Sequence, residues 1–170
     1  MTTTTLLIDS NVWSHLVLSE LPIREKVAAQ LAALRLKYPE AAIATSAMCV
    51  AECLVAARRL LYASDASQFE AVFKARFNQL GVLVVPLTEQ VLDRAATLRA
   101  NRLKLAASRG SQTAGADGGK LLLPDATVAA SCFQFNPPAI LVTENASDFE
   151  FLENGVQQTV AGLIVEKIGG

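Results

Sequence analysis

The chain has 170 residues, of which 52% are hydrophobic, 18% charged and 6% aromatic, and its net charge at pH 7 is −1. This length fits one domain with a substantial apolar core, and the apolar content excludes an intrinsically disordered chain. The near-zero net charge excludes bulk electrostatic attraction to nucleic acid, so any chemistry on nucleic acid must depend on a local site.

The N-terminus and the cysteines indicate the cellular compartment. The first nine residues contain no lysine or arginine, and the apolar run directly before Asp9 is only three residues long, so we expect no secretory signal peptide. No apolar run reaches the roughly 18 residues that a membrane span needs. Cys49, Cys53 and Cys132 match no disulfide framework and have no histidine cluster beside them, and we interpret them as small buried side chains. The sequence therefore predicts a cytoplasmic protein that does not bind membranes.

Short apolar segments alternate along the chain with segments whose apolar residues recur at helical spacing. The run at 81–85 is bounded by glycine and proline, which is typical of a buried parallel strand, and Ser46 is placed to cap the helix after it. This alternation predicts an α/β fold with a mostly parallel sheet of about five strands and helices on both faces. In chain order we predict strands at 4–8, 41–45, 81–85, 139–143 and 163–166, and helices directly after Asn11 and at 23–38, 46–63, 65–79, 89–105 and 122–135.

Residues 107–120 break this pattern. They contain four glycines and no apolar side chain other than alanine, so we predict a flexible loop. Structureless segments of this length are uncommon inside a domain and are often functional. Because the chain on both sides of the loop is needed to complete the sheet, we predict that residues 1–170 form a single domain.

The helix at 122–135 begins with an acid in its first turn. Pro124 suits this position because its missing N–H would have no partner there, and Asp125 follows directly. Only three polar side chains follow in the helix, so most of its surface is expected to be buried. Taken alone, Asp125 is explained by the backbone N–H groups at a helix N-terminus, which favour negative charge.

Three other acids also occupy positions that surface solvation does not explain. Asp9 directly follows the first strand, Glu52 lies in an almost wholly apolar helix, and Asp148 lies in a polar turn after the strand at 139–143. Ligands of an open parallel sheet bind outside the carboxyl ends of its strands, so we expect the four acids to converge there. Converging carboxylates cannot all stay ionised without a counter-charge. Their motifs contain no lysine or arginine, so we predict a divalent cation.

A ligand set made of carboxylates suits hard cations, Mg²⁺ or Mn²⁺, rather than Zn²⁺. Such a cation lowers the pKa of a bound water, holds phosphate oxygens and stabilises a leaving group. The substrate class that this chemistry implies is a phosphodiester or another phosphate ester.

Four segments, in this order, resemble the motifs of PIN-domain proteins. The resemblance spans nearly the whole chain and is strongest to the small PIN ribonucleases that act as VapC-type toxins of prokaryotic toxin–antitoxin pairs. It implies a PIN-like fold, a Mg²⁺- or Mn²⁺-dependent endoribonuclease acting on RNA, a homodimer, and a tight complex with an antitoxin. The segments are Leu-Leu-Ile-Asp-Ser-Asn-Val, Ala-Glu-Cys, Leu-Pro-Asp-Ala-Thr-Val-Ala-Ala-Ser and Leu-Val-Thr-Glu-Asn-Ala-Ser-Asp-Phe.

The same resemblance assigns roles to individual residues. The acids would be both catalytic and metal-binding, and polar neighbours would support them. The resemblance does not decide whether Asn145 or Asp148 contacts the metal, because the family varies at these positions. The acids are Asp9, Glu52, Asp125 and Asp148, and the supporting residues are Ser10, Asn11, Thr143 and Asn145.

Basic residues flanking the loop at 107–120 are candidates for contacts with RNA phosphates, with an ordinary solvated charge as an equal alternative for each. His15, the only histidine, lies near Asp9, but a surface or capping role is favoured over proton transfer. Trp13 is favoured as a packing residue in the core or at a dimer interface. The candidate basic residues are Arg99, Arg102, Arg109 and Lys120.

Two non-catalytic interpretations remain beside the nuclease. A receiver-like signalling module with an acidic Mg²⁺ pocket would carry paired acids after the first strand and a lysine after a late strand. Here Asp9 is single, and residues 143–149 contain no lysine. A PIN-like scaffold that only binds a partner would not need the complete set of acids.

A phosphatase of the haloacid-dehalogenase kind would have Asp-x-Asp where this chain has Asp9-Ser-Asn11. We predict the nuclease and keep a non-catalytic magnesium-binding or partner-binding module as the alternative.

Overall fold

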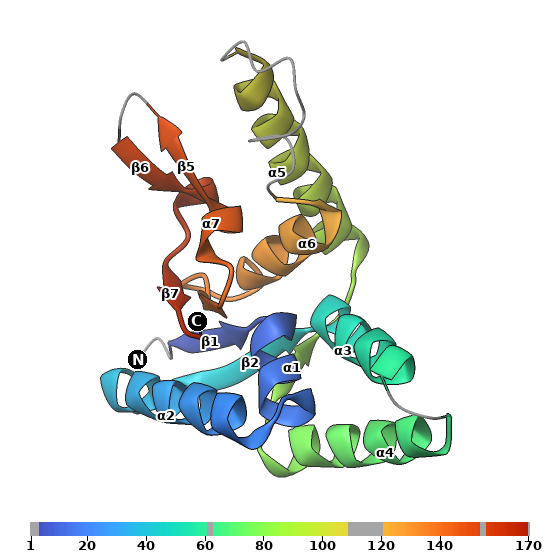
Figure 1. Ribbon diagram of the computed structural model, residues 1–170. Helices are drawn as coiled ribbons and strands as arrows, with labels where there is room; N and C mark the ends of the chain where they lie inside the picture. Colours follow the sequence, from blue (N-terminus) through green and yellow to red (C-terminus); the bar gives the residue numbers. More distant parts are fainter. Residues whose placement is uncertain (1–3, 61–62, 109–120, 154–155, 170) are drawn as a thin grey trace.

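The computed structural model describes residues 4–60, 63–108, 121–153 and 156–169 (Figure 1). All strands of its central sheet are parallel. They are β1 (Thr5–Ile8), β2 (Ala42–Ser46), β3 (Leu83–Val85), β4 (Ile140–Thr143) and β7 (Val165–Lys167). The order across the sheet is β3–β2–β1–β4–β7. The first strand of the chain is therefore the central one, with β2 and β4 on either side.

Helices cover both faces of this sheet (Figure 1). Apolar side chains of α1, α2 and α4 pack on one face and those of α5 and α6 on the other, while α3 contributes to both sides. The described helices are α1 (Ser10–Leu18), α2 (Leu21–Lys37), α3 (Ala47–Leu60), α4 (Ala63–Gln79), α5 (Glu89–Ser108), α6 (Leu123–Cys132) and α7 (Ala146–Phe149).

The two apolar cores share the central strand. Leu7 packs with α5 and α6, whereas Leu6 and Ile8 pack with the helices of the opposite face. All three side chains are fully buried, because successive residues of a strand point to opposite faces and both faces are covered. Burial of each contributes roughly 1.5–3 kcal/mol. This rigid strand holds the residue that follows it, Asp9, at the carboxyl edge of the sheet.

Trp13 connects α1 to the sheet. Its Nε1–H donates to Thr45 Oγ1 at 3.1 Å, and its ring centroid lies 4.6 Å from that of Phe77 on α4. Thr45 in turn donates to the Ile8 carbonyl oxygen at 2.9 Å. The buried indole therefore confirms that Trp13 is a packing residue of the core.

The predicted α/β fold with a five-stranded parallel sheet is confirmed, and Ser46 caps α3 by accepting a hydrogen bond from the Met48 N–H at 3.3 Å. The prediction that the strand at 81–85 is buried was wrong. β3 is short and lies at the edge of the sheet, where no further strand covers it. Leu83 and Val84 are consequently 52% and 47% exposed.

A hairpin and the helix before it were not predicted from the sequence. β5 (Glu150–Glu153) and β6 (Val156–Thr159) form a separate antiparallel sheet directly after α7. The predicted strands β1 and β4 are equally short, but they carry three apolar residues in a row. The sequences Glu-Phe-Leu-Glu of β5 and Val-Gln-Gln-Thr of β6 contain no such run. α5 continues through Ser108, so the predicted loop at 107–120 is helical at its first two residues, and its remainder lies outside the described residues. Among the described helices, none is both long and apolar enough to cross a membrane.

Candidate metal centre

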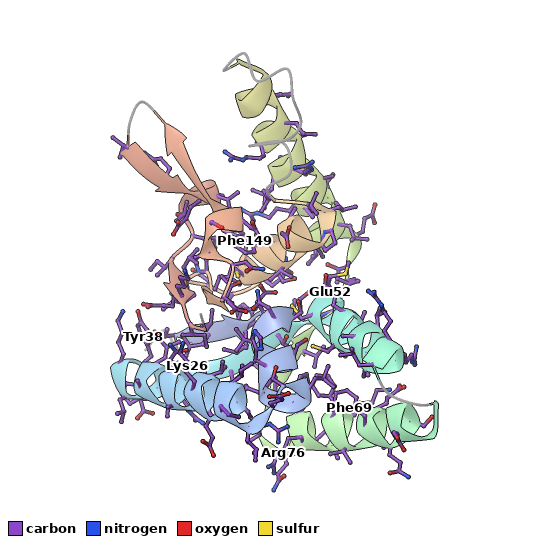
Figure 2. The ribbon with its side chains drawn as sticks, in the orientation of Figure 1. Lys26, Tyr38, Glu52, Phe69, Arg76 and Phe149 are labelled. Atoms are coloured by element: carbon purple, nitrogen blue, oxygen red, sulfur yellow. The ribbon has the colours of Figure 1, made fainter. Side chains whose placement is uncertain are left out.

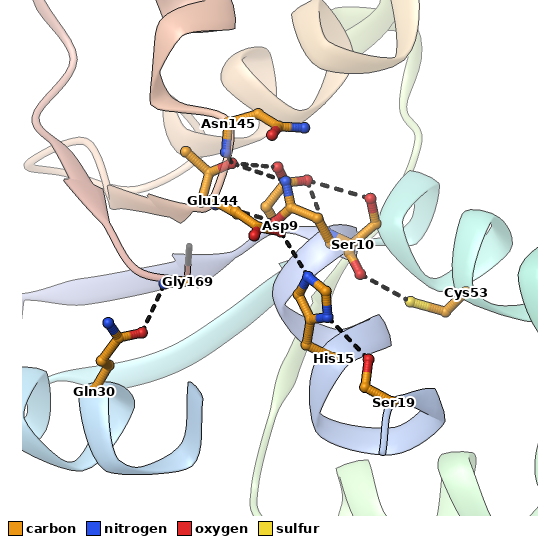
Figure 3. A network of polar contacts seen from close by, with 11 residues as sticks. Asp9, Ser10, His15, Ser19, Gln30, Cys53, Glu144, Asn145 and Gly169 are labelled. Atoms are coloured by element: carbon orange, nitrogen blue, oxygen red, sulfur yellow. Dashed lines mark hydrogen bonds and ion pairs between the residues drawn. The ribbon is translucent and has the colours of Figure 1, made fainter. Parts of the chain in front are cut away.

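The carboxyl ends of β1 and β4 lie side by side and bring two of the predicted motifs together. Ile8 is paired with Val142, and the Asp9 N–H continues the pairing by donating to the Val142 carbonyl oxygen at 3.0 Å. Asp9 is the N-cap of α1, so its side chain lies between the strand end and the first turn of the helix. The sequence motifs around residues 9 and 143 thus form one edge of a single site (Figure 3).

Hydrogen bonds hold the Asp9 carboxylate on both of its oxygens. Oδ1 accepts from the Ser10 N–H at 2.7 Å, and Oδ2 accepts from the Thr143 hydroxyl at 2.7 Å. The Cys49 thiol donates to Oδ1 at 3.7 Å. Burial raises the pKa of Asp9, and the hydrogen bonds from Thr143, Ser10 and Cys49 lower it. Asp9 is therefore a buried acid, 6% exposed, whose charged form depends on its donors.

The Thr143 hydroxyl has one proton to donate, and the neighbouring residues determine its direction. Its Oγ1 accepts from the Asn11 Nδ2–H at 3.2 Å and from the Asn145 N–H at 3.1 Å. Two accepted bonds fill the lone pairs of the hydroxyl, so its O–H is directed at Asp9. Asn11 also accepts from the Glu144 N–H at 3.2 Å, which joins α1 to the turn after β4. Asn11 and Thr143 therefore lie in one hydrogen-bonded network with Asp9, and their supporting roles stay a prediction.

Glu52 lies on α3 (Figure 2), and one of its carboxylate oxygens lies within 4.8 Å of ligand atoms of Asp9 and Cys49. The capped start of α3 places Glu52 in the second turn of the helix, where the side chain is half-buried. Burial raises the pKa of Glu52, the Ser10 hydroxyl lowers it by hydrogen bonding, and the negative charge of Asp9 raises it again. Ser10 therefore supports both acids.

Asp125 enters the site from the N-terminus of α6. The Leu122 N–H donates to Asp125 Oδ2 at 2.9 Å. Asp125 lies in the first turn of α6, and α6 is buried and apolar, so both predictions are confirmed. Burial, followed by the negative charges of Asp148, Asp9 and Glu52, raises the pKa of Asp125 to about 6. The N–H groups at the helix N-terminus do not by themselves determine the pKa of Asp125, because burial and repulsion by neighbouring acids raise it more than the Leu122 hydrogen bond lowers it.

The negative charges of the other three predicted acids thus all act on Asp125. Asp9, Cys49 and Glu52 each offer an atom within 4.8 Å of the others, and Asp148 on α7 acts on Asp125 through its charge. Neighbouring carboxylates repel one another when they are ionised, and a hard divalent cation stabilises their ionised forms by binding their oxygens. On the chemistry of these donors, the residues present fit Mg²⁺ or Mn²⁺.

Cys49 is part of this cluster although the sequence reasoning treated it as a small hydrophobic side chain. It precedes Glu52 by three residues on α3, and residues three apart lie on the same helix face. That spacing was the available signal. All three cysteines, Cys49 included, are buried and free as predicted.

The second unpredicted contact joins His15 of α1 to Glu144, which lies directly after β4. His15 Nε2 lies 2.6 Å from Glu144 Oε2, and both side chains are 27% exposed. His15 Nδ1 also contacts Ser19 Oγ at 2.9 Å (Figure 3). The pair ties α1 to the turn beside the acids, and the surface or capping role favoured for His15 stays a prediction. Asn145, in the same turn, reaches Thr143 through its backbone, while its side chain is exposed.

The candidate phosphate-binding residues are spread more widely. Arg99 and Arg102 lie on α5, where Arg102 is buried with 5% exposure and Arg99 is half-buried. Arg109 and Lys120 lie outside the described residues. Contacts of any of these side chains with RNA stay a prediction.

Comparisons with known proteins agree with this arrangement. The family model described as PIN domain matches residues 6–150, a range that contains all four acids. No curated protein matches the chain in sequence.

Several solved structures are similar to this one. FitAcB from Neisseria gonorrhoeae has 23% sequence identity and a TM-score of 0.55, covering 95% of this chain and 96% of that chain. VapBC2 from Rickettsia felis, bound to a DNA fragment from its promoter, has 13% identity and a TM-score of 0.59, covering 97% and 99%. A toxin–antitoxin complex from Klebsiella pneumoniae has 19% identity and a TM-score of 0.55, covering 85% and 90%. At these identities the similarity concerns the fold.

Proposed function

The chain belongs to the PIN-domain family, and on this premise we propose that it is a divalent-metal-dependent endoribonuclease that hydrolyses RNA phosphodiester bonds. One observation carries the proposal. The pKa of Asp125 is raised to about 6 by burial and by the negative charges of Asp148, Asp9 and Glu52. This electrostatic coupling supports a common cation site for the four acids.

Asp9, Glu52, Asp125 and Asp148 would hold Mg²⁺ or Mn²⁺. When bound, such an ion supplies a water of lowered pKa and neutralises charge on the phosphate oxygens. Ser10 and Thr143 keep the Asp9 carboxylate oriented, because each donates to a different oxygen of it. The Leu122 N–H does the same for Asp125.

We further propose that the protein is the toxin of a toxin–antitoxin pair, that it forms a homodimer and that it works in the cytoplasm. The similar fold of a toxin–antitoxin complex supports an antitoxin partner. Three free cysteines suit a reducing compartment.

The test is cleavage of end-labelled RNA by the purified chain with Mg²⁺ or Mn²⁺, with a single-stranded DNA of the same sequence in parallel. We expect RNA cleavage that EDTA abolishes and that Asp9→Asn reduces by about 100-fold or more, since Asp9 is a ligand rather than a supporting residue. Asp93→Asn is the matched control, because Asp93 is an exposed acid on α5. Cleavage that survives both EDTA and Asp9→Asn would contradict the proposal.

The non-catalytic alternative makes a different prediction. A PIN-like scaffold that only binds a partner would leave RNA intact under all these conditions. Under this alternative, expression of wild type and expression of Asp125→Ala would affect cell growth to the same extent. We expect instead that only the wild type is toxic when expression is induced.

A further inference from the structure

One side chain in the candidate metal centre is not an oxygen donor. Cys49 is fully buried, and its Sγ lies 3.7 Å from Asp9 Oδ1. Asp9, Cys49 and Glu52 each offer one ligand atom, and these atoms lie within 4.8 Å of one another. The cluster thus combines one sulfur and two carboxylates from the end of β1 and from α3.

The spacing suits a cation with affinity for sulfur. In a tetrahedral Zn²⁺ site, metal–sulfur bonds of about 2.3 Å and metal–oxygen bonds of about 2.0–2.2 Å place the sulfur and oxygen about 3.5 Å apart. The Cys49 Sγ to Asp9 Oδ1 distance of 3.7 Å is close to this value. Mg²⁺ takes oxygen ligands and retains water, so Cys49 would not take part in binding it.

We propose that Cys49 gives the acidic centre a second binding mode, in which Cys49 with Asp9 and Glu52 holds a thiophilic divalent cation of the Zn²⁺ class. This inference rests on the proposed function, because it assigns the same acids to a metal. It adds a prediction about selectivity: a thiophilic cation occupies Asp9 and Glu52 and excludes Mg²⁺ or Mn²⁺ from them, so it inhibits the nuclease.

The binding step exchanges one bond for another. The Cys49 S–H bond breaks, its proton passes to solvent, and a metal–sulfur bond forms without any change of oxidation state. Without such a cation the Cys49 thiol donates a hydrogen bond to Asp9 Oδ1. A bound dication reverses the sign of the local field and stabilises the thiolate.

The neighbouring thiol of the same helix is a matched control. Cys53 is equally buried and lies one turn further along α3. Its Sγ contacts the Ser10 carbonyl oxygen at 3.5 Å and Ser14 Oγ at 3.7 Å. It packs in the core on the opposite face of the sheet from Cys49, so its removal perturbs α3 without removing the predicted ligand.

The experiment titrates the purified chain with Cd²⁺ and follows the ultraviolet sulfur-to-cadmium charge-transfer absorption. Mn²⁺ affinity is measured separately by calorimetry. Wild type, Cys49→Ser, Cys49→Ala and Cys53→Ala are compared, with circular dichroism to verify folding. We expect one thiolate–cadmium signal per chain in wild type and in Cys53→Ala. In both Cys49 variants we expect no signal and a Cd²⁺ affinity at least about tenfold lower, with Mn²⁺ affinity changed less than about threefold.

The outcomes separate this inference from the proposed function. Binding of Cd²⁺ without the charge-transfer signal, or a signal that persists in a folded Cys49 variant, overturns the role of Cys49 and leaves the nuclease proposal intact. Absence of both Cd²⁺ and Mn²⁺ binding overturns both. A Cys49-dependent signal in a chain that cleaves no RNA supports the cation site and contradicts the nuclease.

Discussion

Replacing Asp125 by asparagine should stabilise the metal-free protein at neutral pH while it removes activity. Burial and the negative charges of neighbouring acids raise the pKa of Asp125 from an ordinary 3.8 to about 6. A carboxyl with a raised pKa in the folded state destabilises the fold wherever it is ionised. The cost is absent below pH 3.8, grows as the pH rises to about 6, and is complete above that.

The size of the effect follows from the two pKa values. Their difference corresponds to about 3 kcal/mol at pH 7. Asp125 is only half-buried, so solvent screening reduces this figure. The variant also exchanges a charge-assisted hydrogen bond from the Leu122 N–H for a neutral one, which costs about 0.5 kcal/mol. We therefore expect a net stabilisation of about 1–2 kcal/mol, or about 3–6 °C in Tm for a chain of this length.

The assay is thermal unfolding of wild type and Asp125→Asn in EDTA at pH 7 and at pH 4, with Asp93→Asn as a control on an exposed acid of α5. The gain should appear at pH 7, nearly vanish at pH 4, and be absent from the control. Added Mn²⁺ should stabilise wild type more than the variant, because the ion binds the folded site. A Tm that is unchanged or lowered at pH 7, or a gain of equal size at pH 4, would refute the electrostatic reasoning.

Substitutions at three further positions test the contacts around the site. Thr143→Val removes the proton directed at Asp9 and should lower Mn²⁺ affinity about tenfold in calorimetry, whereas Thr143→Ser should retain it. His15→Ala breaks the partly exposed contact with Glu144 and should cost less than about 1 kcal/mol in urea unfolding, with RNA cleavage unchanged. A large loss of cleavage would instead give His15 a catalytic role. Trp13→Phe removes the donor to Thr45 and should lower the free energy of unfolding by about 1–2 kcal/mol, and an unchanged urea midpoint would contradict that.

Much of the site was predictable because its residues stand out in their local sequence. Asp9 ends an apolar strand, Glu52 interrupts an apolar helix, and Asp125 follows a proline at a helix start. Each position can be recognised from neighbours within a few residues. That the acids converge was also predictable, because parallel strands present their carboxyl ends at one edge.

The partners of those residues were less predictable. Cys49 lies 40 positions from Asp9 in the chain, and Thr143 lies 134 positions from it. Cysteine in an apolar helix has the same local pattern whether it packs in the core or touches a carboxylate. Likewise the apolar run that ends in β3 has the pattern of a buried strand, and only its place at the sheet edge exposes Leu83 and Val84.

The amino-acid sequence by itself determined the alternation of strands and helices, the four acids and the kind of cation that they suit. These depend on the period of apolar residues and on the chemistry of side chains, which are local properties. The tertiary structure decided the strand order, which places β1 between β2 and β4 and thereby sets Asp9 against Thr143 and Cys49. It also decided the pKa of Asp125, because burial and the charges of distant residues act through space and leave no trace in the neighbouring sequence.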